Sequence, residues 1–184
     1  SSYTAPDGDY TITPTISAAT GGVELEPNDT SANLINSGTS VSGNISSATD
    51  QDWFSIQTDA ASVMQLNLIA AYDNNGTRID VLDSSGNILW AHTCETDCRS
   101  SDNFSELIGL NAGGTYYIRV TAESSYTAPD GDYTITPTIS AFTGGLELEP
   151  NNDKNNSQNI VSSSSMPGSL SSTTDQDWFS IQAD

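Results

Sequence analysis

Hydrophobic and polar residues alternate with a period of two in most apolar stretches of the chain. The clearest examples are the sequences VMQLNLIA (63–70), TYYIRVTA (115–122) and DYTITPTIS (132–140). Successive side chains of a strand point to opposite faces, so this period predicts strands with one buried face. The residues predicted to face the core are Met64, Leu66, Leu68, Tyr116, Ile118, Val120, Tyr133, Ile135 and Ile139.

Turn-forming residues separate these stretches. Sequences rich in Gly, Asn, Asp and Pro occur at DNNG (73–76), DSSGN (83–87), NAGG (111–114) and APDGD (128–132). Many short strands joined by such turns are typical of an all-β protein, either a sandwich or a barrel. Pro137 cannot donate a ladder hydrogen bond, so we expect its strand to be an edge or final strand. A helical turn is expected only in the sequence NDTSANLI near Asn28.

The sequence repeats itself at long range. Three pairs of segments match, SSYTAPDGDYTITPTIS at 1–17 and 124–140, VELEPN at 23–28 with LELEPN at 146–151, and DQDWFSIQ at 50–57 and 175–182. The matches predict three parts, a C-terminal tail of a preceding unit (1–22), a complete unit (23–145) and the N-terminal part of the next unit (146–184). Units of this length are whole domains rather than solenoid repeats, so we expect tandem β-sandwich domains.

The incomplete units at either end would expose strand edges and apolar faces. Either the chain is a window on a longer tandem array, which is the favoured interpretation, or neighbouring chains complete each other's sandwiches by strand donation. In both cases the predicted partners are neighbouring copies of the same repeat.

The chain is strongly acidic, with 24 Asp and Glu against 4 Lys and Arg and a formal net charge of −20. Nucleic acid and anionic membranes are therefore not expected partners, because phosphate binding needs basic side chains. No apolar run approaches the roughly 20 residues of a membrane span. Abundant Ser, Thr, Asn and Gly favour a secreted, extracellular or cell-surface location. A cation is the more natural partner, although acidity that serves solubility alone is an alternative.

Acidic residues gather at two places in each unit. In the extended stretch VELEPN, Glu24 and Glu26 are expected to share a face while Leu25 points into the core. Asp50 and Asp52 repeat this spacing just before the strand WFSIQ. Like charges at close range oppose folding unless a cation neutralises them.

Calcium is the cation that fits this set of residues best. Ca²⁺ accepts six to eight hard oxygen ligands in irregular geometry, and no Cys or His occurs in the acidic segments to suit a softer metal. The alternative is that these acids are separate solvated side chains at strand ends.

Five elements, ELEPNDT, SGNISSATDQDWFSI, VLDSSGNIL, NAGGTYYIRV and GDYTITPTI, occur in this order along the chain. Together they resemble the bacterial pre-peptidase C-terminal (PPC) domain family, whose relatives include the collagen-binding domains of clostridial collagenases. The resemblance covers residues 23–140. It implies a jelly-roll-like antiparallel β-sandwich on secreted bacterial proteins, usually without catalytic activity.

Some members of this family bind calcium through an acidic N-terminal segment and a later pair of aspartates. The resemblance implies a first Ca²⁺ site made by Glu24, Glu26, Asn28, Asp29, Asp50 and Asp52, with Thr49 as an alternative to Asp50. The matching residues of the next unit are Glu147, Glu149, Asn151, Asp175 and Asp177. Asn152 stands where the first unit has Asp29, so binding is expected to be weaker there unless Asp153 substitutes.

Cys94 and Cys98 lie in the loop sequence HTCETDC, where a local disulfide is expected in an oxidising compartment. Zinc and redox sites are not expected, because a second ligand pair and CxxC spacing are missing. Catalysis has little support, since His92 is the single histidine and no G-x-S-x-G sequence occurs.

Trp53 and Trp178 follow the aspartate pairs and are expected on the face opposite Phe54. As ligand-binding residues they would stack on sugar rings or grip a fibrous ligand; the favoured alternative is that they cover a sheet edge or a contact between domains.

The sequence therefore predicts a non-catalytic, calcium-binding β-sandwich repeat of a secreted bacterial protein, with a structural role in an extracellular fibre or adhesin stalk. The alternative is a carbohydrate- or protein-binding accessory module of a secreted hydrolase or peptidase.

Overall fold

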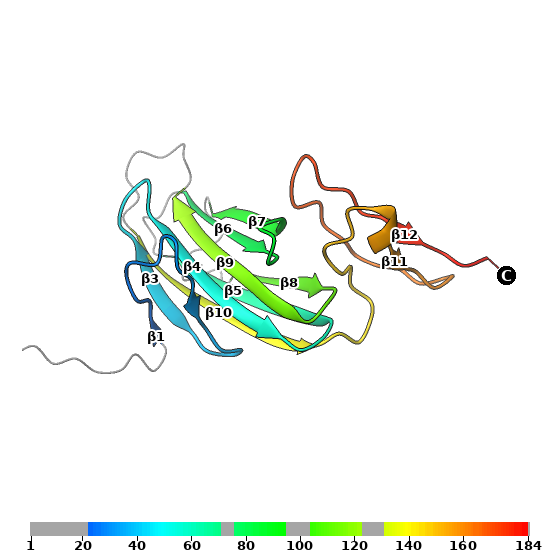
Figure 1. Ribbon diagram of the computed structural model, residues 1–184, viewed down its shortest axis with the longest axis horizontal. Coiled ribbons are helices and arrows are strands. Elements are labelled where there is room, and N and C mark those ends of the chain that lie inside the picture. Colours follow the sequence, from blue (N-terminus) through cyan, green and yellow to red (C-terminus); the bar gives the residue numbers. More distant parts are fainter. Residues whose placement is uncertain (1–21, 71–75, 95–103, 123–130, 184) are drawn as a thin grey trace, which may run out of the picture.

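A computed structural model describes residues 22–70, 76–94, 104–122 and 131–183. Within these residues the protein is all-β, with strands β1 to β12 and a single 3₁₀ helix of three residues, Lys154–Asn156. Ten of the strands form two sheets that pack face to face, and the chain after them continues beyond one end of this sandwich (Figure 1). The predicted β-sandwich is therefore confirmed.

The first sheet has the strand order β1-β3-β10-β5-β8. Its strands are β1 (Gly22–Val23), β3 (Val41–Ile45), β10 (Gly131–Ala141), β5 (Ser62–Ala70) and β8 (Phe104–Leu110). Neighbours are antiparallel, except that β1 runs parallel to β3.

The second sheet has the order β2-β4-β9-β6-β7. Its strands are β2 (Asn33–Leu34), β4 (Gln51–Thr58), β9 (Gly114–Ala122), β6 (Thr77–Leu82) and β7 (Ile88–Cys94). Here too one short strand, β2, pairs in parallel with its neighbour β4, and the other pairs are antiparallel.

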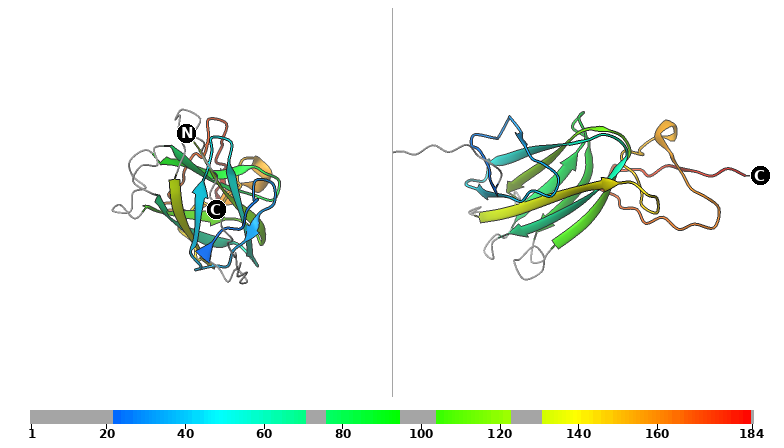
Figure 2. Two further views of the ribbon diagram at one scale, coloured as in Figure 1. Left: turned by 90° about the vertical axis from the view of Figure 1, so that its left-hand side faces the viewer. Right: turned by 90° about the horizontal axis from the view of Figure 1, so that it is seen from below.

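The alternating positions build the core between the two sheets. Met64, Leu66 and Leu68 are fully buried, and so are Ile118 and Val120. The intervening side chains of β5 and β9 are half-buried or exposed, as a period of two requires. The end-on view of Figure 2 shows the two layers that enclose this core. The face assignments made from the sequence are thus confirmed for these strands.

Strand β10 is the final strand of the sandwich in chain order, as predicted from Pro137, but it is not an edge strand. It lies between β3 and β5, and Pro137 is the register partner of Leu66 on β5. Pairing with β3 covers only residues 131–135, so Pro137 lies beyond the part of β10 that is paired on both sides. A proline is tolerated where the ladder on one side has ended.

The prediction that Leu25 points into the core is wrong. Its side chain is 59% exposed, because this segment turns the carboxylates of Glu24 and Glu26 toward Asp52 and Leu25 to the opposite side. The stretch after Asn28 forms the short strand β2 rather than a helical turn; the 3₁₀ helix occurs only in the second copy, where Asp153 caps it.

Residues 146–183 repeat the local structure of the start of the complete unit. Gln158–Asn159 (β11) pairs in parallel with Phe179–Ser180 (β12), in the register with which β2 pairs with β4. The peptide bond before the proline is cis in both acidic segments, at Pro27 and Pro150.

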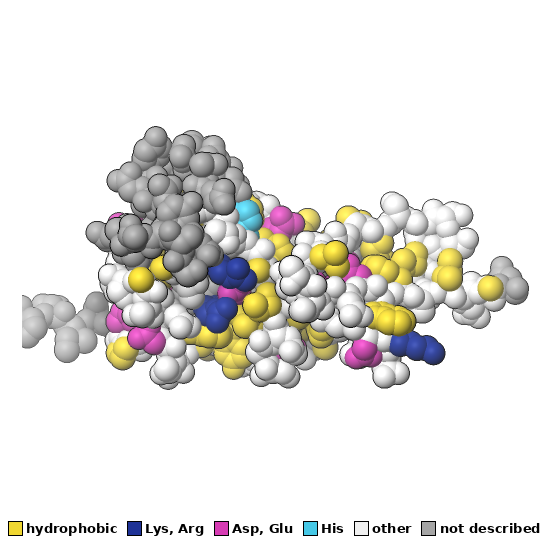
Figure 3. Space-filling view, turned by 90° about the horizontal axis from the view of Figure 1, so that it is seen from above, with side chains coloured by type: hydrophobic (Ala, Val, Ile, Leu, Met, Phe, Trp, Pro, Cys, Tyr) yellow, Lys and Arg dark blue, Asp and Glu magenta, His cyan; other side chains and the backbone are white. Residues whose placement is uncertain are grey.

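The apolar residues of this second copy are exposed. Leu170, Phe179 and Ile181 are 66%, 38% and 67% exposed, whereas their counterparts in the complete unit, Ile45, Phe54 and Ile56, are at most 1% exposed. Figure 3 shows hydrophobic side chains on the surface of the part that extends beyond the sandwich. Within the described residues, no helix has the length and apolar character needed to cross a membrane.

Candidate metal centre

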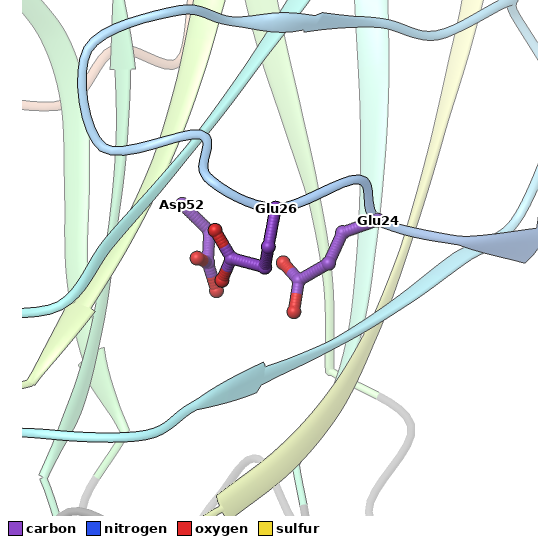
Figure 4. Close-up of side chains that lie close together, drawn as sticks. All are labelled: Glu24, Glu26 and Asp52. Carbon is purple, nitrogen blue, oxygen red and sulfur yellow. The ribbon is translucent and has the colours of Figure 1, made fainter.

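Three carboxylates from two segments converge beside strand β4. Glu24 and Glu26 belong to the segment that follows β1, and Asp52 belongs to β4 (Figure 4). One oxygen from each of these side chains lies within 4.8 Å of the others. Figure 4 shows the three carboxylates pointing toward a common centre. The i, i+2 spacing of the glutamates is what turns both of them to the same side.

Hydrogen bonds hold these carboxylates in place. Glu24 accepts a bond from the Asn44 amide at 2.7 Å and one from the Tyr133 hydroxyl at 2.9 Å. The same hydroxyl lies 2.6 Å from Asp52 Oδ2. Asn28 extends the cluster, since its backbone amide donates to Glu26 at 2.9 Å. The site is therefore preorganised by strands that are distant in the sequence.

Glycine at position 43 makes room for this arrangement. A Cβ atom built there would overlap the Tyr133 hydroxyl and the Glu24 carboxylate. Gly168 has the same relation to Glu147 in the second copy. The absence of a side chain at these positions lets the glutamate approach the backbone closely.

Two buried oxygens of the first cluster have no hydrogen-bond partner among the described residues. They are Asp52 Oδ1 and Asn28 Oδ1, and both residues are fully buried. A buried oxygen without a partner is costly and occurs rarely in proteins. A cation that binds these oxygens would remove that cost.

The pKa of Asp52 reflects the same crowding. Burial raises the pKa of its carboxyl to about 8; the hydrogen bond from Tyr133 acts in the opposite direction, and the charge of Glu24 raises the pKa again. Burial, together with Asp52, likewise raises the pKa of Tyr133 above its ordinary value. These groups face one another with negative charge that no described basic side chain offsets.

Two predicted ligands of the first site have other roles in the structure. Asp50 Oδ2 accepts bonds from the backbone amide and hydroxyl of Ser46, at 2.6 and 2.7 Å, and so closes the turn before β4. Asp29 Oδ1 accepts a bond from the Gln51 amide at 3.1 Å and is exposed. Neither belongs to the group of converging carboxylates, although both add negative charge close to it.

The second copy builds the same cluster. Carboxylate oxygens of Glu147, Glu149 and Asp177 lie within 4.8 Å of one another. Asn151 repeats the role of Asn28, because its backbone amide donates to Glu149 at 3.0 Å and its side-chain amide to Glu147 at 2.8 Å. The Ser169 amide donates to Glu147 at 2.8 Å, as Asn44 does to Glu24.

This second cluster also contains buried oxygens without a partner among the described residues. They belong to Glu149, Asn151 and Asp177. Burial raises the pKa of Glu149 to about 7, against the hydrogen bond from the Asn151 amide, and Asp175 raises it further. Burial and the charge of Glu147 raise the pKa of Asp177 to about 6.

The remaining predicted ligands of the second unit lie around this cluster. Asp175 accepts a bond from the Ser171 amide, the arrangement seen for Asp50 and Ser46. The side-chain amide of Asn152 faces Asp175. Asp153 caps the 3₁₀ helix by accepting from Asn155 and Asn156, so it does not take the place of Asp29.

The donor set of each cluster fits a hard divalent cation. Carboxylate and amide oxygens converge, several of them are unpartnered, and no His or Cys belongs to either cluster. Ca²⁺ prefers such oxygens and tolerates irregular geometry, whereas Zn²⁺ usually binds nitrogen and sulfur.

A different arrangement surrounds Trp53. Its ring packs edge-on against Tyr117 at 6.2 Å, and the Arg119 guanidinium lies 5.3 Å from the ring centroid. An open hollow of about 460 Å³ borders it, lined in part by Asp29 and Asp83. Trp178, by contrast, is 42% exposed and its indole N–H contacts Gln176 at 3.4 Å. Trp53 therefore both packs on its own sheet and borders an accessible surface.

The histidine and cysteine of β7 belong to neither acidic cluster. His92 stacks on Phe104, with ring centroids 4.3 Å apart, and on Trp90 at 5.9 Å. Cys94 ends the strand and is buried. Cys98 lies outside the described residues, so the disulfide between them stays a prediction.

Sequence reasoning missed Tyr133 and Gly43 as parts of the first site. Tyr133 was assigned to the core face of its strand, which is correct, but its hydroxyl reaches two carboxylates at the rim of that core. The repeated sequence DGDYT carries no signal for this contact, because Tyr133 and Asp52 are 81 residues apart.

Comparisons with known proteins complete this description. No protein-family model and no curated protein matches the chain. Among solved structures, the chain is similar to the pre-peptidase C-terminal domain of a collagenase from Bacillus anthracis, with 17% sequence identity and a TM-score of 0.48. The match covers 62% of this chain and all of that one. A similarity of this size carries no functional argument, so the proposals below rest on the residues of this chain.

Proposed function

We propose that this chain is a non-catalytic, calcium-binding β-sandwich repeat of a secreted bacterial protein, with a structural role in an extracellular fibre or adhesin stalk. Its partners are neighbouring copies of the same repeat, and Ca²⁺ is its cofactor. The observation that carries the proposal is the duplicated cluster. Glu24, Glu26 and Asp52 converge with unpartnered buried oxygens, and Glu147, Glu149 and Asp177 do the same.

Electrostatics supports a cation at both clusters. Each brings three carboxylates together within 4.8 Å, in a chain that carries a formal net charge of −20. Without a counter-charge, such a cluster opposes folding. Extracellular modules bind calcium with dissociation constants of about 10⁻⁴–10⁻³ M.

The repetition of local structure supports partnership with further copies. Strands β11 and β12 of residues 146–183 pair in the register with which β2 pairs with β4 in the complete unit. In each repeat the acidic cluster holds the N-terminal segment against the strands of that repeat. The junction between two repeats is then left with little freedom to move, which suits a tandem array.

Calcium titration calorimetry tests the proposal. We expect the chain to bind two Ca²⁺ ions, the Glu24→Gln and Glu147→Gln variants to bind one each, and the double variant to bind none. Asp59→Asn is the matched control, because it removes one charge from an exposed carboxylate at the other end of β4. Absence of calcium binding by the unaltered chain would falsify the proposal.

A second candidate function rests on the hollow beside Trp53. An aromatic ring next to polar side chains is suited to stacking on sugar rings, so a carbohydrate- or protein-binding accessory module of a secreted hydrolase or peptidase is the alternative. A glycan array probed with the chain and with Trp53→Ala tests it, with Trp178→Ala as the control. Binding that disappears only in Trp53→Ala supports this alternative.

A further inference from the structure

The second acidic segment, residues 146–151, is hydrogen-bonded to the sandwich that precedes it, and we call this contact seating. Glu149 forms a parallel bridge with Leu110 at the end of β8. Its amide donates to the Gly109 carbonyl at 2.9 Å, and its carbonyl accepts from the Asn111 amide at 3.0 Å. The Asn111 side chain donates to the Pro150 carbonyl at 2.6 Å. Backbone and side-chain bonds thus fix the chain on both sides of the Glu149 carboxylate.

The glycine at position 109 leaves room for this contact. A Cβ atom there would overlap the Glu147 carbonyl oxygen and touch the Leu148 side chain. A second contact lies on the other sheet, where the Ser171 hydroxyl donates to the Ile88 carbonyl of β7 at 3.3 Å. Strands β7 and β8 are the edges of the two sheets on the same side of the sandwich. The start of the next repeat therefore contacts the end of β8 and the start of β7, which belong to these two edge strands.

The first acidic segment makes no comparable contact among the described residues, and it serves below as the unseated copy. Val23 and Leu25 are 69% and 59% exposed, whereas Leu146 and Leu148 are half-buried. Glu26 is exposed, but Glu149 is only 5% exposed. Among the described residues, no backbone hydrogen bond of Glu26 corresponds to those of Glu149. The two segments lie at opposite ends of the sandwich (Figures 1 and 2).

The two clusters differ in the length of one hydrogen bond. The bond from the asparagine side chain to the first glutamate is 2.8 Å in the seated copy, from Asn151 to Glu147, and 3.3 Å in the unseated copy, from Asn28 to Glu24. Ligands that are already held in position lose less freedom on binding an ion, so the seated site starts with an advantage.

From these contacts we infer that the β8 edge of each sandwich is the receptor for the acidic segment of the following repeat, and that seating there strengthens cation binding by that segment. The inference rests on the calcium sites proposed above. Binding and seating are reciprocal, because a cation that prefers the seated segment must stabilise the seated state by the same factor. Calcium thereby fixes one repeat against the next.

The test first isolates each calcium site in its own variant and then blocks the contact at Gly109. Glu24→Gln with Asp52→Asn leaves only the second site, and Glu147→Gln with Asp177→Asn leaves only the first. Gly109→Val is added to each background, and calcium affinity is measured by calorimetry. We expect the dissociation constant of the second site to rise at least roughly tenfold, within the usual range of coupling between sites. That of the first site should change less than twofold, which also shows that the sandwich remains folded.

Two further readouts make the outcome decisive. Asn111→Ala removes only the bond to Pro150 and should weaken the second site by a smaller factor. Hydrogen exchange at the Glu149 and Asn111 amides should be slow in the unaltered chain and fast in Gly109→Val, with or without calcium. Equal affinity of the second site with and without Gly109→Val overturns the coupling, as does an equal loss at both sites. If neither single-site chain binds calcium, the proposed function fails as well.

Discussion

Asp52 and Asp80 are both fully buried carboxylates of the second sheet, on strands β4 and β6 that flank β9. Asp80 is held by two arginines, with Arg78 Nε and Nη2 at 2.8 Å from its Oδ1 and Arg119 at its Oδ2. Asp52 faces Glu24, Glu26 and the Tyr133 hydroxyl instead. Arginines of the chain neutralise the charge of Asp80. No described basic side chain pairs with Asp52, so neutralising its charge depends on a cation from the solution.

The difference shows how the chain uses its few basic residues. Two of its 4 Lys and Arg neutralise Asp80. In the described residues no basic side chain forms an ion pair with either acidic cluster. A fixed counter-charge stabilises the fold under all conditions, but a dissociable one makes the stability of that region depend on the concentration of an ion.

Replacing Asp80, the carboxylate paired with arginines, should have the largest effect on the free energy of unfolding. Asp80→Ala leaves Arg78 and Arg119 without their acceptor, and loss of one partner of a buried ion pair costs about 3–5 kcal/mol. We expect a loss near 3 kcal/mol in the free energy of unfolding, measured by urea denaturation, and the same loss with and without calcium. Asp59→Ala is the exposed control. A loss below about 1 kcal/mol, or one that depends on calcium, would contradict the comparison.

Replacing Asp52 with a neutral residue should change the stability of the chain by an amount that depends on calcium. At calcium roughly 100 times its dissociation constant, binding contributes about 2.7 kcal/mol per site, and Asp52→Asn should lose most of it. With a chelator the same variant should be at least as stable as the unaltered chain, because a neutral amide replaces a carboxyl whose charged form is disfavoured by burial and by Glu24. Thermal melts with and without calcium measure the difference. Equal shifts under the two conditions would refute the dependence on an ion.

A smaller effect is expected at the hydroxyl that the two carboxylates share. Tyr133→Phe removes the hydroxyl that lies 2.6 Å from Asp52 and 2.9 Å from Glu24, and a hydrogen bond to a charged group contributes about 1.5–3 kcal/mol. We expect a loss of about 2 kcal/mol by urea denaturation. Tyr116→Phe is the matched control, since its hydroxyl donates to the neutral Ala112 carbonyl at 2.9 Å and should cost about 1 kcal/mol. The ranking of the two variants is the decisive result.

The smallest effect concerns Asn152, which stands where the first acidic segment has Asp29. Asn152→Asp should tighten calcium binding at the second site by roughly two- to fivefold, as expected for one added charge near the surface. Asp29→Asn should weaken the first site by a similar factor. Calorimetry on the single-site chains measures both changes. Changes of opposite sign at either site would show that this position does not act through its charge.

The strands were predictable from the sequence because their pattern is local. Alternation identified the buried faces of β5 and β9 and placed Glu24 and Glu26 on one side of their segment. It could not show which side of that segment faces the sandwich, so Leu25 was assigned wrongly. An isolated extended segment has two equivalent faces until tertiary contacts choose between them.

The composition of the candidate site was only partly predictable. Spacing found the acids, but it could not distinguish Asp52, which turns into the cluster, from Asp50, which closes a turn with Ser46. Tyr133 and the seat at Gly109 depend on contacts between distant strands, which no single-sequence pattern records. The same limit explains why β10 is internal although Pro137 suggested an edge.

The bonds between Glu149 and the end of β8 have a mechanical consequence. They lie across the strand direction, so a pull on the chain beyond Asn151 along that direction loads them together rather than one after another. Several bonds that must break at once resist force better than bonds that open in sequence. In the proposed array, such a joint would resist tension better than a flexible linker alone.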